Sequence, residues 1–196
     1  MVSGRSKGSG KREIGFFDRP APPLARDLLG EILVHRVSGC ERRARIVETE
    51  AYLGPIDRAS HAYHGRTART EVLFGPPGRI YVYLIYGIHE LLNIVAGKQE
   101  GEAQCVLIRA AEPLDGWEAD LSGPGKLTRA LGITRRHNGL NLAGDELCVL
   151  EDSEYRPRIT ITRRVGIDYA EAWRDAPLRF VDARSQAVSR PAFGKR

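Results

Sequence analysis

The sequence is poor in the features that mark secreted and membrane-spanning proteins. Its three cysteines, Cys40, Cys105 and Cys148, are widely spaced and form no Cys-x-x-Cys pair. This argues against a disulfide scaffold and a thiolate zinc site, and favours buried or half-buried free thiols. No apolar run approaches the roughly 18 residues of a membrane span, and the N-terminus lacks the apolar segment of a secretory signal. We therefore expect a protein that stays in the cytosol or on the nucleoid and has no membrane partner.

Lysine is also scarce, and none lies between Lys11 and Lys98. The formal net charge is nevertheless +5, mostly through arginine. This charge is compatible with a polyanionic partner, although many arginine-rich proteins bind none. The segment 1–13 is rich in Gly, Ser, Lys and Arg, which predicts a flexible basic tail. It is not a phosphate-binding loop, because Ser9 stands where the second glycine of that motif is required.

A chain of 196 residues with 42% hydrophobic residues fits one globular domain. Short strands in hairpin order with few helices predict a single α+β domain over residues 14–184, with an antiparallel sheet. A loose tail is expected at 185–196. The expected elements are a helix from Pro22 to Gly30, strands at 31–37, 43–49, 79–85, 88–95, 105–111, 147–150 and 159–164, a loop at 54–78, and a helix at 124–131 that ends at Gly132.

Glu48, Glu50 and Tyr52 stand at alternate positions of one expected strand, so they share a face with neighbours about 6.6 Å apart. A carboxylate beside an aromatic at a strand end suits a general base that faces a pocket with a stacking wall. The alternative is structural: Glu48 pairs with a surface arginine and Glu50 caps a turn. Arg109, in an apolar strand, needs an anionic partner, which is either one of these carboxylates or a DNA phosphate.

A second candidate region is the expected hairpin, where Tyr81 and Tyr83 share a strand face and Tyr86-Gly87 forms the turn. Glycine supplies positive φ in such turns. Tyr86 at the tip either wedges between DNA base steps or folds back onto its own sheet. Asn93 lies in an otherwise apolar strand and needs partners if buried, since an unpaired amide costs about 1–3 kcal/mol.

Two further candidates concern phosphate and metal binding. Lys126 follows Gly-Pro-Gly at the start of a short helix, where it either meets a phosphate or is merely solvated. His61 and His64 are spaced like metal ligands, but no third or fourth ligand follows at a recognisable spacing. We therefore expect no metal.

Several motifs occur together in one order over residues 15–182. They are Glu-Thr-Glu-Ala-Tyr-Leu-Gly-Pro at 48–55, Ser-His at 60–61, Tyr-Val-Tyr-Leu-Ile-Tyr-Gly at 81–87, Asn93, Cys-Val-Leu-Ile-Arg-Ala at 105–110, Gly-Pro-Gly-Lys-Leu at 123–127, Arg-Arg-Val-Gly-Ile at 163–167, Trp173, and Pro-Leu-Arg-Phe at 177–180. With this set the sequence closely resembles the alkyladenine (3-methyladenine) DNA glycosylase family. The resemblance implies one compact α+β domain around a curved antiparallel sheet with flanking helices and a protruding hairpin at 79–95.

The resemblance also implies a monomeric, cofactor-free enzyme of base excision repair. Such an enzyme flips an alkylated or deaminated purine (3-methyladenine, 7-methylguanine, hypoxanthine or ethenoadenine) out of duplex DNA and hydrolyses its N-glycosidic bond, leaving an abasic site. Glu50 would deprotonate the attacking water, Arg109 and the backbone carbonyl of Val165 would hold that water, and Tyr86 would fill the gap in the duplex. A cationic alkylated purine leaves readily, so a placed water and a nearby carboxylate are the main needs. The scarcity of lysine argues against a Schiff-base lyase.

The base pocket follows from the same resemblance. Tyr52 and Tyr83 would sandwich the flipped base, and His61 would complete the pocket through its backbone N–H. Tyr81 would support the His61 ring. Asn93 would crowd the amino group of guanine and so disfavour normal bases.

The sequence departs from the family at Asp57-Arg58, at Arg69-Thr70 and at 89–92, which leaves the lesion preference open. Two rival functions are a hydrolase of free nucleosides or sugars that uses Glu48 and Glu50, and a damage-binding protein that flips bases without cutting. The presence of Glu50 disfavours the second. A helix-hairpin-helix glycosylase conflicts with the β-rich pattern.

Overall fold

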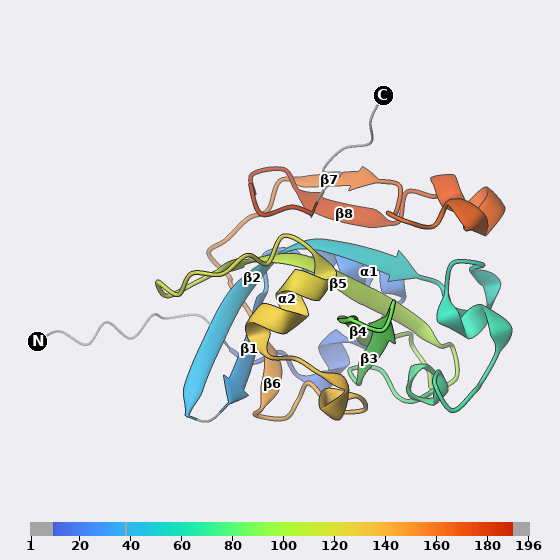
Figure 1. Ribbon diagram of the computed structural model, residues 1–196, viewed down its shortest axis with the longest axis horizontal. Helices are drawn as coiled ribbons and strands as arrows, with labels where there is room; N and C mark the ends of the chain where they lie inside the picture. The colour runs from blue at the N-terminus through green and yellow to red at the C-terminus, as the bar shows by residue number, and fades with distance from the viewer. Residues whose placement is uncertain (1–9, 38, 190–196) are drawn as a thin grey trace, which may run out of the picture.

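The computed structural model describes residues 10–37 and 39–189, which fold around an eight-stranded antiparallel sheet that curls on itself (Figure 1). Six strands follow the order β3-β4-β5-β2-β1-β6, and β8 pairs with both β2 and β7. The strands are β1 Ile32–Val37, β2 Cys40–Tyr52, β3 Ile80–Ile85, β4 His89–Ala96, β5 Gln104–Pro113, β6 Leu147–Leu150, β7 Ile159–Thr162 and β8 Arg179–Asp182. The expected α+β class with a curved antiparallel sheet is confirmed.

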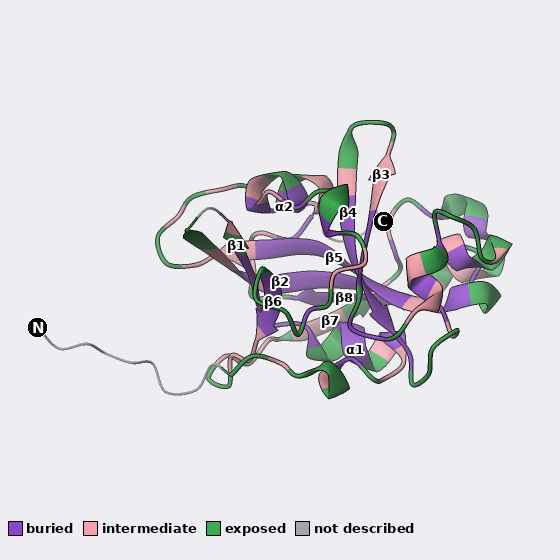
Figure 2. Ribbon diagram, turned by 90° about the horizontal axis from the view of Figure 1, so that it is seen from below, coloured by how far each residue is buried: buried purple, intermediate pink, exposed green. Residues whose placement is uncertain are grey.

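Two α-helices, α1 (Ala21–Asp27) and α2 (Pro124–Leu131), lie on opposite faces of the sheet (Figures 1 and 2). Prolines in the first turn start each helix, and α2 ends at Gly132, which has a left-handed φ of 74°. Helix α1 is shorter than expected, because the chain turns toward β1 before Gly30. Short 3₁₀ helices complete the described residues: η1 Ile14–Phe16, η2 Gly54–Ile56, η3 His61–His64, η4 Glu71–Phe74, η5 Arg135–His137 and η6 Asp168–Asp175.

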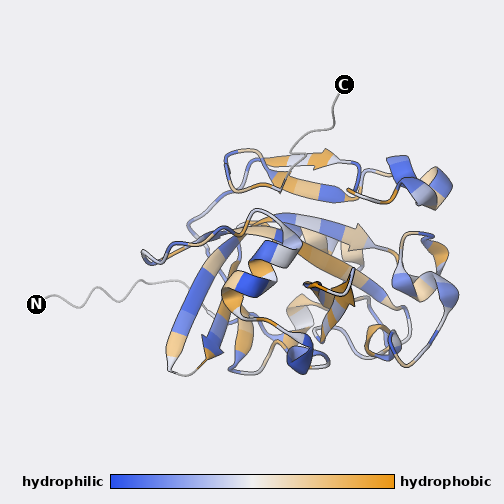
Figure 3. Ribbon diagram, viewed as in Figure 1, coloured by the Kyte–Doolittle hydropathy of each residue, from blue (hydrophilic) through white to orange (hydrophobic). Residues whose placement is uncertain are grey.

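Strand β2 positions the polar groups of the protein interior. It is longer than the expected strand 43–49, and residues 46–51 are all buried. A register shift around Glu48 marks a β-bulge against β5. The buried strands form the purple centre of Figure 2, and hydrophobic colouring gathers on the central strands in Figure 3. Because residues 46–51 are covered, both carboxylates of this segment lie inside the protein.

Hairpin β3–β4 turns at Tyr86-Gly87, as expected. Both residues have positive φ, 53° and 72°, and the tip is coloured as exposed in Figure 2. Tyr86 is 86% exposed and Ile88 73% exposed. The ring of Tyr86 therefore does not fold back onto its own sheet.

Several local expectations were wrong. Strand β8 was not predicted, β7 ends at Thr162 instead of residue 164, and the loop 54–78 contains η2, η3 and η4. The segment 185–189, expected to be loose, packs inward and buries Ser189. Most of the expected basic tail lies outside the described residues, but at its end Lys11 is ion-paired with Asp145 and Arg12 with Glu31.

The cysteines are free thiols, as expected, although Cys40 is exposed and only the other two are buried. In the described part of the chain, no helix combines the length and the apolar character that a membrane crossing requires.

Candidate active site

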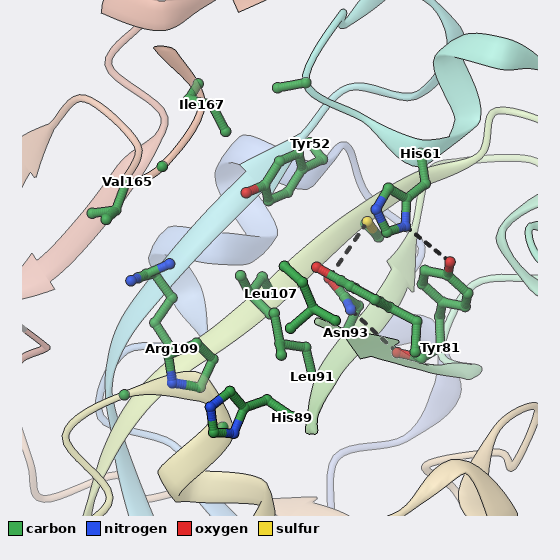
Figure 4. Close-up of a pocket in the computed structure, with 18 of the residues that line it drawn as sticks. Tyr52, His61, Tyr81, His89, Leu91, Asn93, Leu107, Arg109, Val165 and Ile167 are labelled. Carbon is green, nitrogen blue, oxygen red and sulfur yellow. Dashed lines mark hydrogen bonds between the residues drawn. The ribbon is translucent and has the colours of Figure 1, made fainter. Parts of the chain in front are cut away.

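A pocket of about 520 Å³ opens between the sheet, the start of α2 and the segment 165–169 (Figure 4). Its lining comes from β2, β3, β4 and β5, from η3 and η4, and from the glycine-rich start of α2. Leu91 and Leu107 contribute apolar surface, and aromatic rings contribute much of the rest. The volume and lining are those of a site for a small organic ligand.

Glu50 is fully buried behind the pocket lining and accepts hydrogen bonds from three directions. The Tyr52 hydroxyl and the Arg109 guanidinium donate to Oε2 at 2.9 and 3.3 Å. The backbone N–H of Val165 donates to Oε1 at 2.8 Å. These three donors all line the pocket, so the carboxylate sits one layer beneath its surface.

Glu48 is also fully buried and belongs to a second layer. It accepts hydrogen bonds from Arg109 Nε at 2.8 Å, from Arg179 Nε at 2.7 Å, and from both the backbone N–H and the hydroxyl of Ser189. Burial alone would lower the pKa of Arg109, but the carboxylates of Glu50 and Glu48 raise it above its ordinary value. Arg109 is thus a permanent cation bridging two carboxylates. The structural alternative for Glu48 and Glu50, at the surface and at a turn, is wrong.

Tyr52 is held by a buried ion pair that the sequence did not reveal. Arg164 and Asp57 have fully buried side chains and form a bidentate pair with N–O distances of 2.5 and 2.9 Å. The Arg164 guanidinium carbon lies 4.6 Å from the centre of the Tyr52 ring. Burial, followed by the charge of Glu50, raises the pKa of the Tyr52 phenol, so Tyr52 remains an O–H donor to Glu50.

His61, Tyr81 and Tyr83 form an aromatic cluster on another wall of the pocket. His61 Nδ1 lies 3.0 Å from the Tyr81 hydroxyl (Figure 4). The His61 and Tyr83 rings are 4.4 Å apart between centres, and the two tyrosines stack at 5.4 Å. Burial raises the pKa of Tyr81 to about 12, so its hydroxyl stays protonated beside the histidine.

His61 gives the protein a predictable response to acid. Burial, with the nearby charge of Arg69, lowers the pKa of His61 from 6.5 to about 4. The unfolded chain takes up this proton at higher pH than the folded protein. The free energy of unfolding therefore falls as the pH drops from about 6.5 to about 4, by up to about 3 kcal/mol.

Urea unfolding of the wild type and of His61→Asn at pH 7 and about pH 4.5 measures this loss. We expect the variant to lose less stability than the wild type over this interval. An equal loss in both proteins would assign the acid sensitivity to other groups.

Asn93 is buried between the aromatic cluster and β5. Its amide donates to the backbone carbonyl of Tyr81 at 3.2 Å, and its carbonyl faces the Cys105 thiol at 3.9 Å (Figure 4). Burial raises the pKa of Cys105 to about 12, which leaves this thiol inert. The partners that a buried asparagine requires are therefore present, and its orientation is fixed.

Lys126 lies on the pocket lining at the first turn of α2. Its ammonium group forms an exposed ion pair with Asp120 at 2.7 Å and also contacts Ser122. Neither of the two arrangements expected from sequence included this pair. Within the described residues, His61 and His64 do not join any group of three metal-ligating side chains.

Comparison with known proteins shows which family has this sequence. The family model described as methylpurine-DNA glycosylase (MPG) matches residues 15–186, which include every pocket and carboxylate residue named above. The chain belongs to the methylpurine-DNA glycosylase family. The family resemblance read from the sequence motifs is thereby confirmed.

Relatives of the methylpurine-DNA glycosylase family cover nearly the whole chain. A protein named "Putative 3-methyladenine DNA glycosylase" from Anaeromyxobacter sp. (strain Fw109-5) is 51% identical over 176 residues, 89% of this chain and 90% of the relative. A protein of the same name from Alkaliphilus oremlandii (strain OhILAs) is 44% identical, over 92% of this chain and 99% of the relative. The family name denotes hydrolysis of N-glycosyl bonds in DNA.

Proposed function

We propose that this protein is a monofunctional DNA glycosylase that extrudes an alkylated or deaminated purine from duplex DNA and hydrolyses its N-glycosidic bond with a water activated by Glu50. The observation that carries the proposal is the fully buried carboxylate of Glu50 directly behind an aromatic pocket of about 520 Å³, held by Tyr52, Arg109 and Val165. A fixed carboxylate next to a base-sized cavity can serve as a general base and can stabilise a cationic sugar.

In the proposed reaction the protein supplies position and charge. The leaving purine departs with the bonding electrons of the glycosidic bond, and C1′ of the sugar becomes oxocarbenium-like. A cationic alkylated purine thereby leaves as a neutral base, whereas neutral hypoxanthine or ethenoadenine must also take up a proton from solvent as it leaves. Glu50 takes a proton from water as the water oxygen bonds to C1′. Arg109 and the N–H of Val165 already contact the Glu50 carboxylate. Arg109 and the carbonyl of the same Val165 would orient that water. Glu50 has no exposed surface, so the water must replace one of its present hydrogen-bond partners. We propose that it replaces the Tyr52 hydroxyl, because the Tyr52 ring would contact the extruded base.

The aromatic side chains suit a base that has left the stack. Tyr52 on one side and Tyr83 with His61 on the other offer ring surfaces that recognise a purine by stacking. His61 would contribute its backbone N–H as well, and Tyr81 supports the His61 ring. Asn93 is rigidly held at the pocket wall, where it would crowd the amino group of guanine.

The first test is release of free base from duplex oligonucleotides with one hypoxanthine or ethenoadenine, alongside methylated genomic DNA, free nucleosides and undamaged duplex. We expect base release and abasic sites only with damaged DNA. Release from free nucleosides would favour the nucleoside-hydrolase alternative, and tight lesion binding without release would favour a damage-binding protein. Either outcome contradicts the proposal.

Tyr86 is proposed as the wedge that occupies the gap in the duplex. Its side chain is exposed at the hairpin tip, and its backbone has a positive φ that is unfavourable for tyrosine. The side chains of Ile88 and Tyr169 are exposed as well. Asparagine tolerates this backbone conformation better than tyrosine does. If the wedge offsets about 1.4 kcal/mol of the cost of unstacking the base, it raises the equilibrium constant for base extrusion about tenfold.

We therefore expect Tyr86→Asn to keep or slightly raise the melting temperature and to lower single-turnover excision about tenfold or more. The matched variant Tyr63→Asn alters another exposed tyrosine and should leave excision unchanged. Unaltered excision by Tyr86→Asn would rule out the wedge.

The proposed enzyme leaves the DNA strand intact. Lys126 lines the pocket, but its Nζ contacts the Asp120 carboxylate at 2.7 Å and the Ser122 hydroxyl, so it is not placed as a free amine to attack C1′. Borohydride in the reaction should trap no covalent protein–DNA adduct. A trapped adduct that disappears in Lys126→Met would contradict this expectation.

A further inference from the structure

A second cluster of potential ligands, none of which lines the pocket, joins three separate elements. It consists of His35 in β1, His137 at the end of η5, and Glu146 just before β6. Glu146 Oε1 lies 3.3 Å from His137 Nε2 and 3.9 Å from His35 Nε2. All three ligand atoms lie within 4.8 Å of one another, and no other such group occurs among the residues described. A tetrahedral zinc ion with bonds of 2.0–2.1 Å separates its ligand atoms by about 3.3–3.5 Å.

The two imidazoles present their Nε2 atoms toward Glu146, and that of His35 is free to bind a metal. His35 Nδ1 lies 2.6 Å from the carbonyl of Leu131, so it carries the proton and donates it. The buried Nε2 of His35 then has a lone pair and no hydrogen-bond partner. His137 Nδ1 lies 2.9 Å from both the backbone N–H, which donates to it, and the carbonyl of Thr134. Its Nε2 accepts a hydrogen bond from Arg136. Histidine ligands of metals usually donate the other ring N–H to a carbonyl, as His35 does here.

We propose that His35, His137 and Glu146 bind a zinc-type divalent cation, with water as the fourth ligand. Two imidazoles and one carboxylate suit zinc, whereas calcium and magnesium prefer oxygen ligands alone. The orphaned lone pair of His35, in a side chain with no exposed surface, gains a partner when the ion binds. The ion links β1, η5 and the start of β6, so it stabilises the fold and takes no part in base excision.

Arg136 is the competitor for this site. Its guanidinium donates to His137 Nε2 at 3.2 Å and lies 3.6 Å from Glu146. The side chain is 59% exposed, so it can move into solvent when the cation arrives. Arg136→Gln removes a positive charge and should tighten zinc binding, because like charges a few ångströms apart repel.

The test uses the full chain without a histidine tag, freed of metal with a chelator and titrated with Zn²⁺ against a chromophoric competitor. We expect one Zn²⁺ per chain, a higher melting temperature with zinc, and Co²⁺ absorption bands typical of four-coordinate sites. Glu146→Gln changes a side chain that is 47% exposed and leaves both buried rings in place. It should weaken Zn²⁺ binding at least about tenfold.

Glu118→Gln, at another exposed glutamate, and His61→Asn, in the pocket, should bind zinc as the wild type does. Arg136→Gln should bind it more tightly. No zinc binding by the wild type, equal affinity in Glu146→Gln, or an affinity of Arg136→Gln no higher than that of the wild type would overturn the proposal.

Discussion

The Glu50→Gln variant should bind a lesion-containing duplex as tightly as the wild type and release base at least about 10³-fold more slowly. Glutamine has nearly the same shape but cannot accept a proton from water or carry the negative charge that stabilises the sugar cation. Single-turnover base release and gel-shift binding on the same ethenoadenine duplex measure the two quantities. A loss of both binding and release would point to a misfolded pocket instead.

The position of Glu50 calls for a check on folding in that experiment. Its two oxygens accept from Tyr52, Arg109 and Val165, and an amide leaves at least one of these buried donors unpaired, at about 1–3 kcal/mol. Thermal unfolding of Glu50→Gln should therefore show a modest destabilisation. Glu41→Gln, at the exposed start of the same strand β2, is the matched control and should change neither unfolding nor excision.

The largest expected effect on stability belongs to Asp57→Asn. Asp57 and Arg164 have no exposed side-chain surface, and Asp57 also accepts the backbone N–H groups of Leu53 and Ala59. Removing the carboxylate charge leaves the Arg164 cation buried without a counter-charge, which typically costs about 3–5 kcal/mol. Urea unfolding measures this directly.

The same substitution carries a functional consequence. Arg164 lies over the Tyr52 ring and precedes Val165, so a displaced guanidinium disturbs two of the three contacts of Glu50. We expect excision by Asp57→Asn to fall even at temperatures where the protein is folded. Glu71→Gln breaks the exposed pair of Glu71 with Arg66 and should alter neither property. Equal stability of Asp57→Asn and the wild type would mean that this pair does not hold the site.

Much of this site could be predicted from the sequence, because its polar residues fall in short motifs in a fixed order. The alternation of Glu48, Glu50 and Tyr52 predicted a strand with these side chains on one face. The apolar neighbours of Arg109 predicted that its charge has an anionic partner. The structure brings these four side chains together. Tyrosine before glycine likewise predicted the turn at the hairpin tip.

The remaining contacts depend on pairings that no local pattern encodes. Asp57 and Arg164 are 107 residues apart, and an arginine next to a valine gives no sign of its partner. Ser189 lies in a segment whose composition favours a loose tail, yet its backbone caps Glu48. Strand β8 was missed because four residues next to Pro177 carry too short a pattern. The three ligands His35, His137 and Glu146 meet only after β1 and β6 pair.

The most direct test of the central claim follows extrusion and hydrolysis in one reaction. Ethenoadenine is fluorescent, and its emission changes when it leaves the base stack. Stopped-flow mixing of an ethenoadenine duplex with excess protein, together with quenched sampling of released base, separates the two steps. For the wild type we predict a fast emission change followed by base release, and for Glu50→Gln the same emission change with no release. Release by Glu50→Gln at the wild-type rate would contradict the assignment of Glu50 as the group that activates water.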